Sequence, residues 1–464
     1  MARFPLFGTG AEAKSVRYSA QRRLNVFVEP RKDGDRAQAA WYGTAGLSLF
    51  GSSLGDAPVR GMLQAGDYLY CVHRGTLYQV NSAGTATSRG TLSTTSGRVD
   101  MAWDGTYVVI VDGTVGYTFH TGTNAFSVIS DADFPDTCNT CAFIAGRILV
   151  DKNGTGEFYC GDSYAPTSWD ATNFATAESS PDDLVRVYVD GGEIVLFGDK
   201  TTEFWGNTGA ADFPFGPVQG AAVEWGLAAR WSVAQLGGSI AFLASNRLGQ
   251  VQVVSLQGYA PRVISDADLE TKINRYTTTS DATAFSYLLG GHVFYQLNFP
   301  TDGKSWLFDL NSGLWSELES GTEGARHRCE MGANFNGQTI AADYETGQLY
   351  VLDLDVYTDN GAVIARELRS RHVFDENPVT IRELWLDMET GIGLEGGAAP
   401  QVMLSISRDG GHTWGNERWT NAGEIGEFTK AVKWRRLGMA DDFVLKFRMT
   451  EPCKFAVLGA WLTT

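Results

Sequence analysis

The sequence has little positive charge for its size. Its 464 residues include 37 Lys and Arg against 54 Asp and Glu, so the formal net charge is −17 and the pI is about 4.8. A protein that grips nucleic acid needs a basic face, and this composition therefore argues against tight DNA binding. It does not argue against lining a passage through which DNA slides, because negative walls repel phosphates. Solubility is the alternative explanation of the acidity, and composition does not separate the two.

Long hydrophobic runs are also lacking. No run approaches the roughly 18 apolar residues of a membrane span. The apolar stretch within residues 1–14 is too short for a signal peptide. We therefore expect a protein that is made and folded in a cytosol.

Cysteine is scarce and scattered. Six cysteines are spread over the chain, which argues against a disulfide framework. Cys138 and Cys141 form one C-x-x-C pair, but a zinc ribbon needs a second pair or two suitably spaced histidines. Neither is present, so we expect neither a metal nor a cofactor.

Catalytic constellations are missing as well. The six histidines are far apart and unpaired by any motif. "GSSLG" at residues 51–55 matches G-x-S-x-G, but a nucleophile elbow needs a following helix, and "DAPVRG" is not helical. "DLDVYTDNG" at residues 353–361 lacks the spacing of a calcium loop. We expect no enzymatic activity, although the many carboxylates leave a pair for glycoside hydrolysis open.

Glycine, in contrast, is abundant and regularly placed. A glycine turn, an alternating run, a polar turn and a second, often aromatic run recur, as in "GGEIVLFGDKTTEFWGN" at residues 191–207. The glycines before each first strand are Gly66, Gly105, Gly146, Gly192, Gly238, Gly291 and Gly337. Their spacing of 39 to 53 residues is typical of a four-stranded propeller blade. The alternative is a large irregular β-sandwich with many hairpins.

The repeated pattern of turns and alternating runs predicts an all-β chain in three parts. Residues 1–55 form an N-terminal segment whose strands could close the propeller, residues 56–361 form a β-propeller of six or seven blades, and residues 362–464 form an antiparallel β-sandwich. One short helix is expected within residues 265–276, with Ser265 as its N-cap.

Basic residues concentrate in the C-terminal part, and the rest of the chain is correspondingly more acidic. Opposite charge on two parts of one chain suits contacts between copies in a ring. Arg435 and Arg436 are therefore candidate assembly contacts. Charged solvent faces on ordinary strands are the alternative.

"SRDGGHTW" at residues 407–414 has the S-x-D-x-G-x-T-W form of an Asp box. Ser407, Asp409, Gly411 and Trp414 are expected to build a structural turn: the carboxylate accepts turn amides, the glycine permits positive φ, and the indole packs over the hairpin. Asp boxes are familiar from sialidase propellers, where they are scaffold. A sialidase would carry several, and here one box lies outside the repeated region.

Both ends of the chain resemble a known family. "RRLNVFVEP" followed by "WYGTAGL", and later "LWLDMETGIG", "PQVMLSISRDGGHTWGNERW" and "AVKWRRLGMADDFVLKFRM", are similar to the packaged DNA stabilisation proteins of short-tailed phages, also called tail accessory or tail hub proteins. The segment "ISDADLETKINRY" resembles a mid-chain part of the same family.

The resemblance implies a structural subunit of the virion tail, assembled in the host cytoplasm. In such a family the protein forms a homo-hexameric ring below the portal and its adaptor, continues and closes the DNA channel, and docks tail fibres or tailspikes and a tail plug or needle. Related nozzle proteins also carry a β-propeller. Double-stranded DNA would pass without specific binding. A propeller glycoside hydrolase and a carbohydrate-binding adhesin of a virion are the alternatives.

Overall fold

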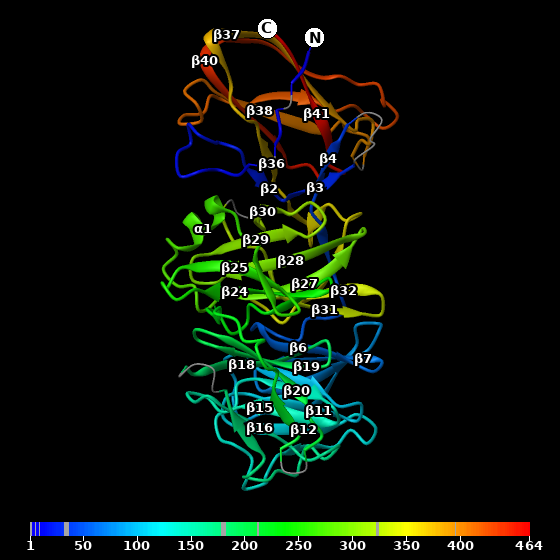
Figure 1. The fold of residues 1–464 in the computed structure, drawn as a ribbon. Helices are drawn as coiled ribbons and strands as arrows, with labels where there is room; N and C mark the ends of the chain where they lie inside the picture. Colours follow the sequence, from blue (N-terminus) through cyan, green and yellow to red (C-terminus); the bar gives the residue numbers. More distant parts are fainter. Residues whose placement is uncertain are drawn as a thin grey trace.

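The computed structural model describes residues 2–4, 6–8, 10–31, 37–177, 182–210, 213–321, 324–394 and 396–464. Within these ranges the chain is almost entirely β-strand, with one α-helix, α1 (Ala267–Ile273). Figure 1 shows an elongated molecule in which the propeller occupies the larger part and a second β-domain, carrying both termini, occupies one end. The prediction of an all-β chain with a propeller and a C-terminal sandwich is confirmed.

Four blades are separate four-stranded antiparallel sheets. Their strands, from the propeller axis outward, are β6 (Val59–Ala65), β7 (Tyr68–His73), β8 (Thr76–Val80) and β9 (Ala86–Thr91); β10 (Asp100–Trp103), β11 (Tyr107–Val111), β12 (Gly116–His120) and β13 (Phe126–Val128); β14 (Cys141–Ile144), β15 (Arg147–Asp151), β16 (Glu157–Cys160) and β17 (Phe174–Thr176); and β18 (Leu184–Asp190), β19 (Glu193–Gly198), β20 (Thr202–Asn207) and β21 (Phe215–Pro217).

The remaining blades take in extra strands or join the second domain. One has β22 (Gly226–Leu227) and β23 (Ala234–Leu236) beside β24 (Ser239–Ser245), then β25 (Val251–Gln257) and β26 (Ala260–Val263); one has β27 (Thr283–Leu289), β28 (His292–Phe299), β29 (Lys304–Asp309) and β30 (Leu314–Leu318); one has β31 (Cys329–Phe335), β32 (Gln338–Asp343), β33 (Leu349–Asp353) and β5 (Gly46–Leu49), with β34 (Thr358–Asp359) and β35 (Ala362–Val363) at its edge.

The blades form a closed ring. Inner strands of successive blades contact one another from β6 through β10 and β14 to β18, and from β23 through β27 and β31 back to β6. The β18–β21 blade contacts the next blade through β19 and β22. Six of the sheets are blades in their own right, and the seventh blade, β27–β30, is part of a larger sheet. The described residues therefore make a propeller of seven blades, within the predicted range.

Apolar residues of the middle strands stack between blades and make the core. Val108 and Ile110 of β11 are fully buried and pack with Tyr70 and Val72 of β7 in the preceding blade. Each fully buried side chain of this kind contributes about 1.5–3 kcal/mol to folding. Val109 and Val111 of the same strand face the next blade instead, because successive side chains of a strand point to opposite sides.

The N-terminal segment serves both domains. Its strand β5 pairs antiparallel with β33, so the last blade takes its outer strand from the start of the chain. Strands β1 (Ala2–Phe4), β2 (Arg23–Leu24), β3 (Val26–Pro30) and β4 (Ala39–Gly43) belong instead to the sheet of the second domain. The two ends of the propeller are thus held together by backbone hydrogen bonds.

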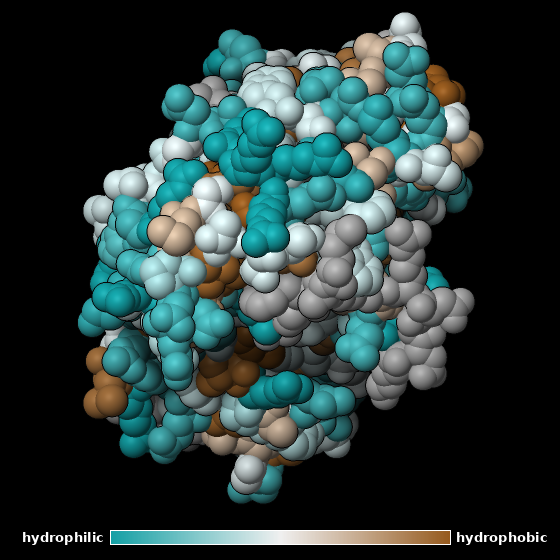
Figure 2. Space-filling model, turned by 90° about the horizontal axis from the view of Figure 1, so that it is seen from above, coloured by the Kyte–Doolittle hydropathy of each residue, from teal (hydrophilic) through white to brown (hydrophobic). Residues whose placement is uncertain are grey.

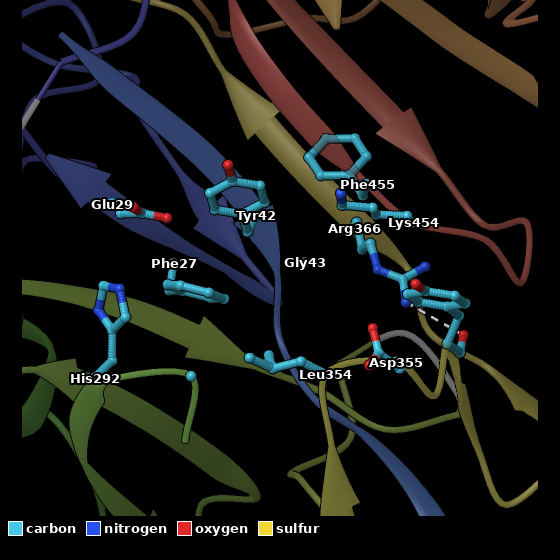
Figure 3. A pocket seen from close by; sticks show the side chains of 12 residues that line it. Phe27, Glu29, Tyr42, Gly43, His292, Leu354, Asp355, Arg366, Lys454 and Phe455 are labelled. Carbon is cyan, nitrogen blue, oxygen red and sulfur yellow. Dashed lines mark hydrogen bonds between the residues drawn. The ribbon is translucent and has the colours of Figure 1, made fainter. Parts of the chain in front are cut away.

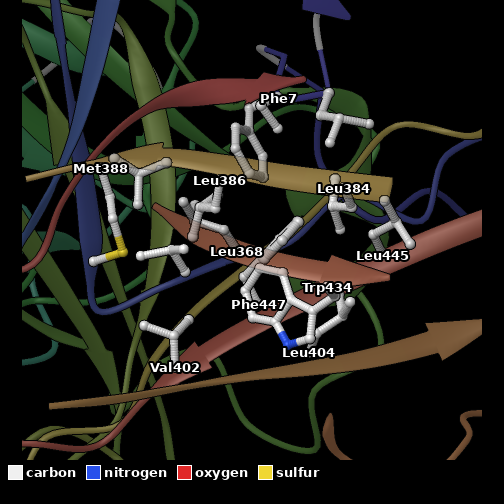
Figure 4. Close-up of a cluster of buried hydrophobic side chains, with 14 of the residues drawn as sticks. Phe7, Leu368, Leu384, Leu386, Met388, Val402, Leu404, Trp434, Leu445 and Phe447 are labelled. Atoms are coloured by element: carbon white, nitrogen blue, oxygen red, sulfur yellow. The ribbon is translucent and has the colours of Figure 1, made fainter. Parts of the chain in front are cut away.

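The second domain is a sandwich built around one long strand. Its strands are β36 (Arg366–Arg369), β37 (Val373–Met388), β38 (Gln401–Ser407), β39 (Arg418–Asn421), β40 (Val432–Met449) and β41 (Ala456–Thr463). The first part of β40 pairs with β37, and its last part pairs with β36 and β38, so β40 passes from one layer to the other. Aromatic rings fill the space between the layers: the centre of the Phe7 ring lies 5.5 Å from that of Phe447 (Figure 4). It lies 5.2 Å from the centre of the Trp41 ring.

One continuous sheet joins the two domains. Strand β2 pairs in parallel with β30 at the outer edge of its blade and antiparallel with β36 of the sandwich. The sandwich is therefore attached at the rim of the propeller, at the end opposite β11–β16 (Figure 1). Arg22 reinforces this joint, because its guanidinium lies 3.0 Å from Glu319 of the blade and 3.5 Å from Glu367 of the sandwich.

The single helix starts one residue later than predicted. Asp266, and not Ser265, is the N-cap of α1, and its carboxylate accepts a hydrogen bond from the Leu269 amide at 2.8 Å. The Ser265 hydroxyl donates instead to Glu270 at 2.9 Å. Leu269 and Ile273 are buried, as the spacing indicated.

Candidate functional site: the C-terminal domain and its junction with the propeller

The Asp box forms a tight polar turn after β38. The Ser407 hydroxyl donates to Asp409 at 2.6 Å and accepts the Gly411 amide at 2.8 Å. Asp409 also accepts the Thr413 amide at 2.9 Å and the Thr413 hydroxyl at 2.6 Å. Hydrogen bonds from Ser407 and Thr413 hold the pKa of Asp409 well below its usual range. The hydrogen bonds of the turn thus involve Ser407, Asp409 and Gly411 of the motif, together with Thr413.

The turn also anchors a distant segment of the chain. Gly411 has φ 95°, and a Cβ there would lie 2.8 Å from the Val16 side chain. His372 completes the contact: its Nδ1 lies 2.8 Å from the Asp442 carboxylate and its Nε2 lies 2.9 Å from the Val16 carbonyl. Sequence alone could not join Val16 to the Asp box, because the segments lie at opposite ends of the chain.

Trp414 lies over neighbouring strands. The guanidinium of Arg369 is 5.4 Å from the centre of its ring, and the ammonium of Lys446 is 4.8 Å away. The indole is half-buried. It therefore links the Asp-box turn to β36 and β40 through cation–π contacts.

Arg435 and Arg436 are adjacent but differ in their surroundings. Arg435 is 72% exposed, and its Nε donates to Glu383 on β37 at 3.0 Å. Arg436 adopts φ 57° at a bulge in β40, and its carbonyl accepts a hydrogen bond from Arg418. Its side chain is exposed, and the structure records no ion pair for it within the described residues. Of the two, Arg436 has the charge that is free for another molecule.

The end of the molecule with both termini is mostly hydrophilic, with small, separate hydrophobic patches (Figure 2). Large exposed apolar side chains of the C-terminal domain are Phe374, Trp419, Ile425, Phe428 and Met439. Single exposed apolar residues are normal on a protein surface, so these do not by themselves mark an interface.

Charged side chains from several blades meet near the propeller axis, which the sequence did not indicate. Arg98 pairs with Glu330 at 3.3 Å, and Arg186 lies 3.5 Å from Asp100. The guanidinium groups of both arginines lie over the ring of Trp231, at 5.8 and 5.1 Å. These residues come from non-neighbouring blades, and they therefore occupy the centre of the ring.

A cavity of about 280 Å³ lies where the sandwich meets the propeller. Its lining residues come from both domains and are Phe27, Glu29, Tyr42, Gly43, Gly290, His292, Leu354, Asp355, Tyr357, Arg366, Lys454 and Phe455 (Figure 3). Arg366 is 1% exposed, and the Phe27 ring is edge-on to His292 at 5.0 Å. No sequence motif pointed to this cavity, because its residues are scattered from β3 to the turn before β41.

The described residues contain neither a cluster of metal ligands nor a helix that could span a membrane. No group of three or more His, Cys, Asp or Glu side chains there is placed to hold a metal ion. Cys138 and Cys141 are buried and unbridged, and burial raises the pKa of both thiols. No helix in those ranges has the length and apolar character of a membrane span.

Comparison with known proteins gives matches over nearly the whole chain. The family model "Bacteriophage P22 Gp10, beta-propeller" matches residues 2–357, and "Bacteriophage P22 Gp10, beta-sandwich" matches residues 365–464. Tail hub protein gp10 of Salmonella phage P22 is 24% identical over 326 residues, which cover 64% of this chain and 63% of that protein. The chain thus matches less than two thirds of that relative's length.

Solved structures give more distant likenesses. The WD40 domain of Neurospora crassa Pan2 has a TM-score of 0.42 and 11% identity, with 70% of this chain and 97% of that chain covered. BamB from Moraxella catarrhalis has a TM-score of 0.39 and 12% identity, with 72% and 96% covered. These likenesses do not bear on function. The family models do, and by them the chain belongs to the bacteriophage P22 Gp10 family, with both the propeller and the sandwich of that family.

Proposed function

We propose that this protein is a structural subunit of a phage tail hub. The observation that carries the proposal is the pair of family matches, which follow one another along the chain and leave few residues outside them. The tail hub role belongs by name to the P22 relative and is extended here to this chain. The role requires interfaces and stiffness, and it requires no catalytic group.

In this proposal copies of the chain form a homo-hexameric ring below the portal and its adaptor, in the virion tail, after assembly in the host cytoplasm. The fold supports such a part, because each blade is hydrogen-bonded internally and packed on its neighbours, and β5 and β2 tie the propeller to itself and to the sandwich. The ring must be stiff because the packaged DNA presses on the exit that the ring closes. The ring would retain the DNA and dock tail fibres or tailspikes and a plug or needle.

The arrangement of charge supports a DNA passage between copies and not through a propeller. Side chains such as Arg98, Glu330 and Trp231 occupy the propeller axis. A passage bounded by several copies would be walled by a chain with a net charge of −17, which repels phosphates and lets DNA slide.

The proposal is tested by mixing the purified full chain with its portal–adaptor complex and measuring the mass of the product by light scattering. Addition of six copies per portal complex is the expected result. The protein alone is a poor test, since hub subunits can require the adaptor as a template. A chain that stays monomeric in the presence of the portal–adaptor complex contradicts the proposal.

A further inference from the structure

We propose that the cavity between the sandwich and the propeller binds a small organic monoanion. Its carboxylate would contact Arg366 and Lys454, and its apolar body would lie against Phe27, Tyr42 and Leu354. The proposal does not depend on the proposed role in ring assembly. It depends on the residues that line the cavity.

Arg366 provides the main argument, because it is a buried cation that forms no ion pair within the described residues. It is 1% exposed, and its Nη1 and Nη2 donate to the backbone carbonyls of Glu451 and Tyr357 at 3.3 and 3.2 Å. Its Nε has no hydrogen-bond partner in the described part of the chain. Asp359 lies close enough to act on this charge, yet no ion pair joins the two side chains. A buried charge requires compensation, and an anion in the cavity would provide it.

Lys454 supplies a second positive charge at the cavity. Its Nζ lies 2.7 Å from Glu389, so its charge is partly compensated, and its side chain is 42% exposed. Figure 3 shows Arg366 and Lys454 on the same side of the cavity, with Phe27, Tyr42 and Leu354 toward the opposite side. The lining is therefore polarised, with cations at one end and apolar walls beside them.

Two carboxylates restrict the ligand's charge. Glu29 lines the side of the cavity opposite the cations, and Asp355 lies exposed on the cationic side (Figure 3). Both would repel a second negative charge, so a monocarboxylate fits the lining better than a nucleotide or an inorganic phosphate. The volume of about 280 Å³ lies just below the roughly 300–1,000 Å³ of drug-sized sites, which indicates a small ligand.

The walls are held open by local structure. A Cβ on Gly43 would lie 2.5 Å from the Arg366 Nε, so glycine at this position leaves room for the guanidinium. Gly290 has φ 59°, and a Cβ there would lie 2.6 Å from the Leu354 side chain. The Phe27 ring is fixed edge-on against Phe294 at 5.4 Å. These contacts build the cavity before any ligand arrives.

The test is calorimetric titration of the full chain with phenylacetate, which carries one carboxylate on an aromatic body. We expect saturable one-site binding with a Kd no weaker than about 1 mM, and a higher melting temperature in its presence. Benzylamine, which has the same ring and the opposite charge, should not bind, and inorganic phosphate should bind at least tenfold more weakly.

Variants of the lining residues test whether phenylacetate binds in this cavity. Leu354→Trp fills the apolar side and should weaken binding at least tenfold, and Lys454→Met should weaken it severalfold. Arg366→Gln should abolish binding, but if it fails to fold, the other two variants carry the test. Lys430→Met removes a cation of the same domain that does not line the cavity and should leave binding unchanged. Absence of saturable binding, or binding that Leu354→Trp leaves intact, would overturn the proposal.

Discussion

At the scale of single residues, burial of ionisable groups makes stability depend on pH. His327 is buried beside the β29–β31 strands, where its Nδ1 accepts the Cys329 amide at 3.2 Å. Burial, assisted by the charge of Arg328, lowers the pKa of His327 to about 4. The unfolded chain then binds this proton more readily, so stability falls as the pH drops from about 6.5 toward 4.

We expect His327 to destabilise the protein by about 2 kcal/mol at pH 5 relative to pH 7. Urea unfolding of the wild type and His327→Gln at both pH values measures this effect, and the variant should lose most of the pH dependence. His412→Gln is the control, because His412 is exposed. If the wild type and His327→Gln lose the same free energy of unfolding between pH 7 and pH 5, His327 is not the source of the pH dependence.

Asp359 behaves in the opposite sense. Burial raises the pKa of Asp359 to about 6, and the Ser320 hydroxyl and the Arg366 charge offset only part of this effect. Ionisation of this group therefore costs stability as the pH rises from about 4 to about 6. Asp359→Asn should raise the free energy of unfolding by about 3 kcal/mol at pH 8 and by little at pH 3. A destabilised variant at pH 8 would mean that the carboxylate has a partner in solution.

The Asp-box carboxylate should be stabilising at neutral pH. Asp409→Ala removes the acceptor for the Thr413 amide and hydroxyl and for the Ser407 hydroxyl. Loss of such a capping group should lower the free energy of unfolding by about 1 kcal/mol, measured as a lower midpoint in urea. Asp441→Ala, an exposed carboxylate on β40, is the matched control. If both variants have the same midpoint in urea, the Asp409 carboxylate does not stabilise this turn.

At the scale of elements, strand β5 decides whether the propeller ring stays closed. Leu47 is 1% exposed and stands opposite Leu352, whereas Leu49 on the same strand is 53% exposed. Leu47→Ala should lower the free energy of unfolding by about 2–5 kcal/mol, and Leu49→Ala by less than about 0.5 kcal/mol. Denaturant unfolding of both variants distinguishes a closing strand from a loosely attached one, for which the two losses would be equal.

The strands and turns could be predicted from the sequence, but contacts between distant segments could not. Alternation and spaced glycines predicted the blades because a strand's side-chain period is local. The Asp-box contacts were likewise local, within residues 407–413. By contrast, Arg98 and Glu330 are 232 residues apart, and the cavity lining is gathered from six separate segments. Such juxtapositions depend on blade order and on the β2–β30 pairing, which no local pattern encodes. The helix cap was missed by one residue because Ser265 and Asp266 are both good caps.

At the scale of the whole molecule, the exposed charge of Arg436 is the feature most open to assembly. Arg436→Glu should reduce ring formation on the portal–adaptor complex at least tenfold without changing the melting temperature, because the side chain makes no ion pair within the described chain. Arg435→Glu should act more weakly, since Glu383 already offsets Arg435. Density-gradient sedimentation of the mixtures measures both. Normal rings from Arg436→Glu would remove this contact from the proposal.

The central claim is that this stiff propeller and its sandwich form a ring whose DNA passage lies between copies. Cryo-electron microscopy of the portal, the adaptor and this protein, with packaged DNA present, tests it most directly. We predict six copies around the DNA, each propeller axis lying off the ring axis and blocked by Arg98, Arg186 and Trp231. DNA density running through a propeller, or a tail in which this chain does not encircle the DNA, would contradict the account.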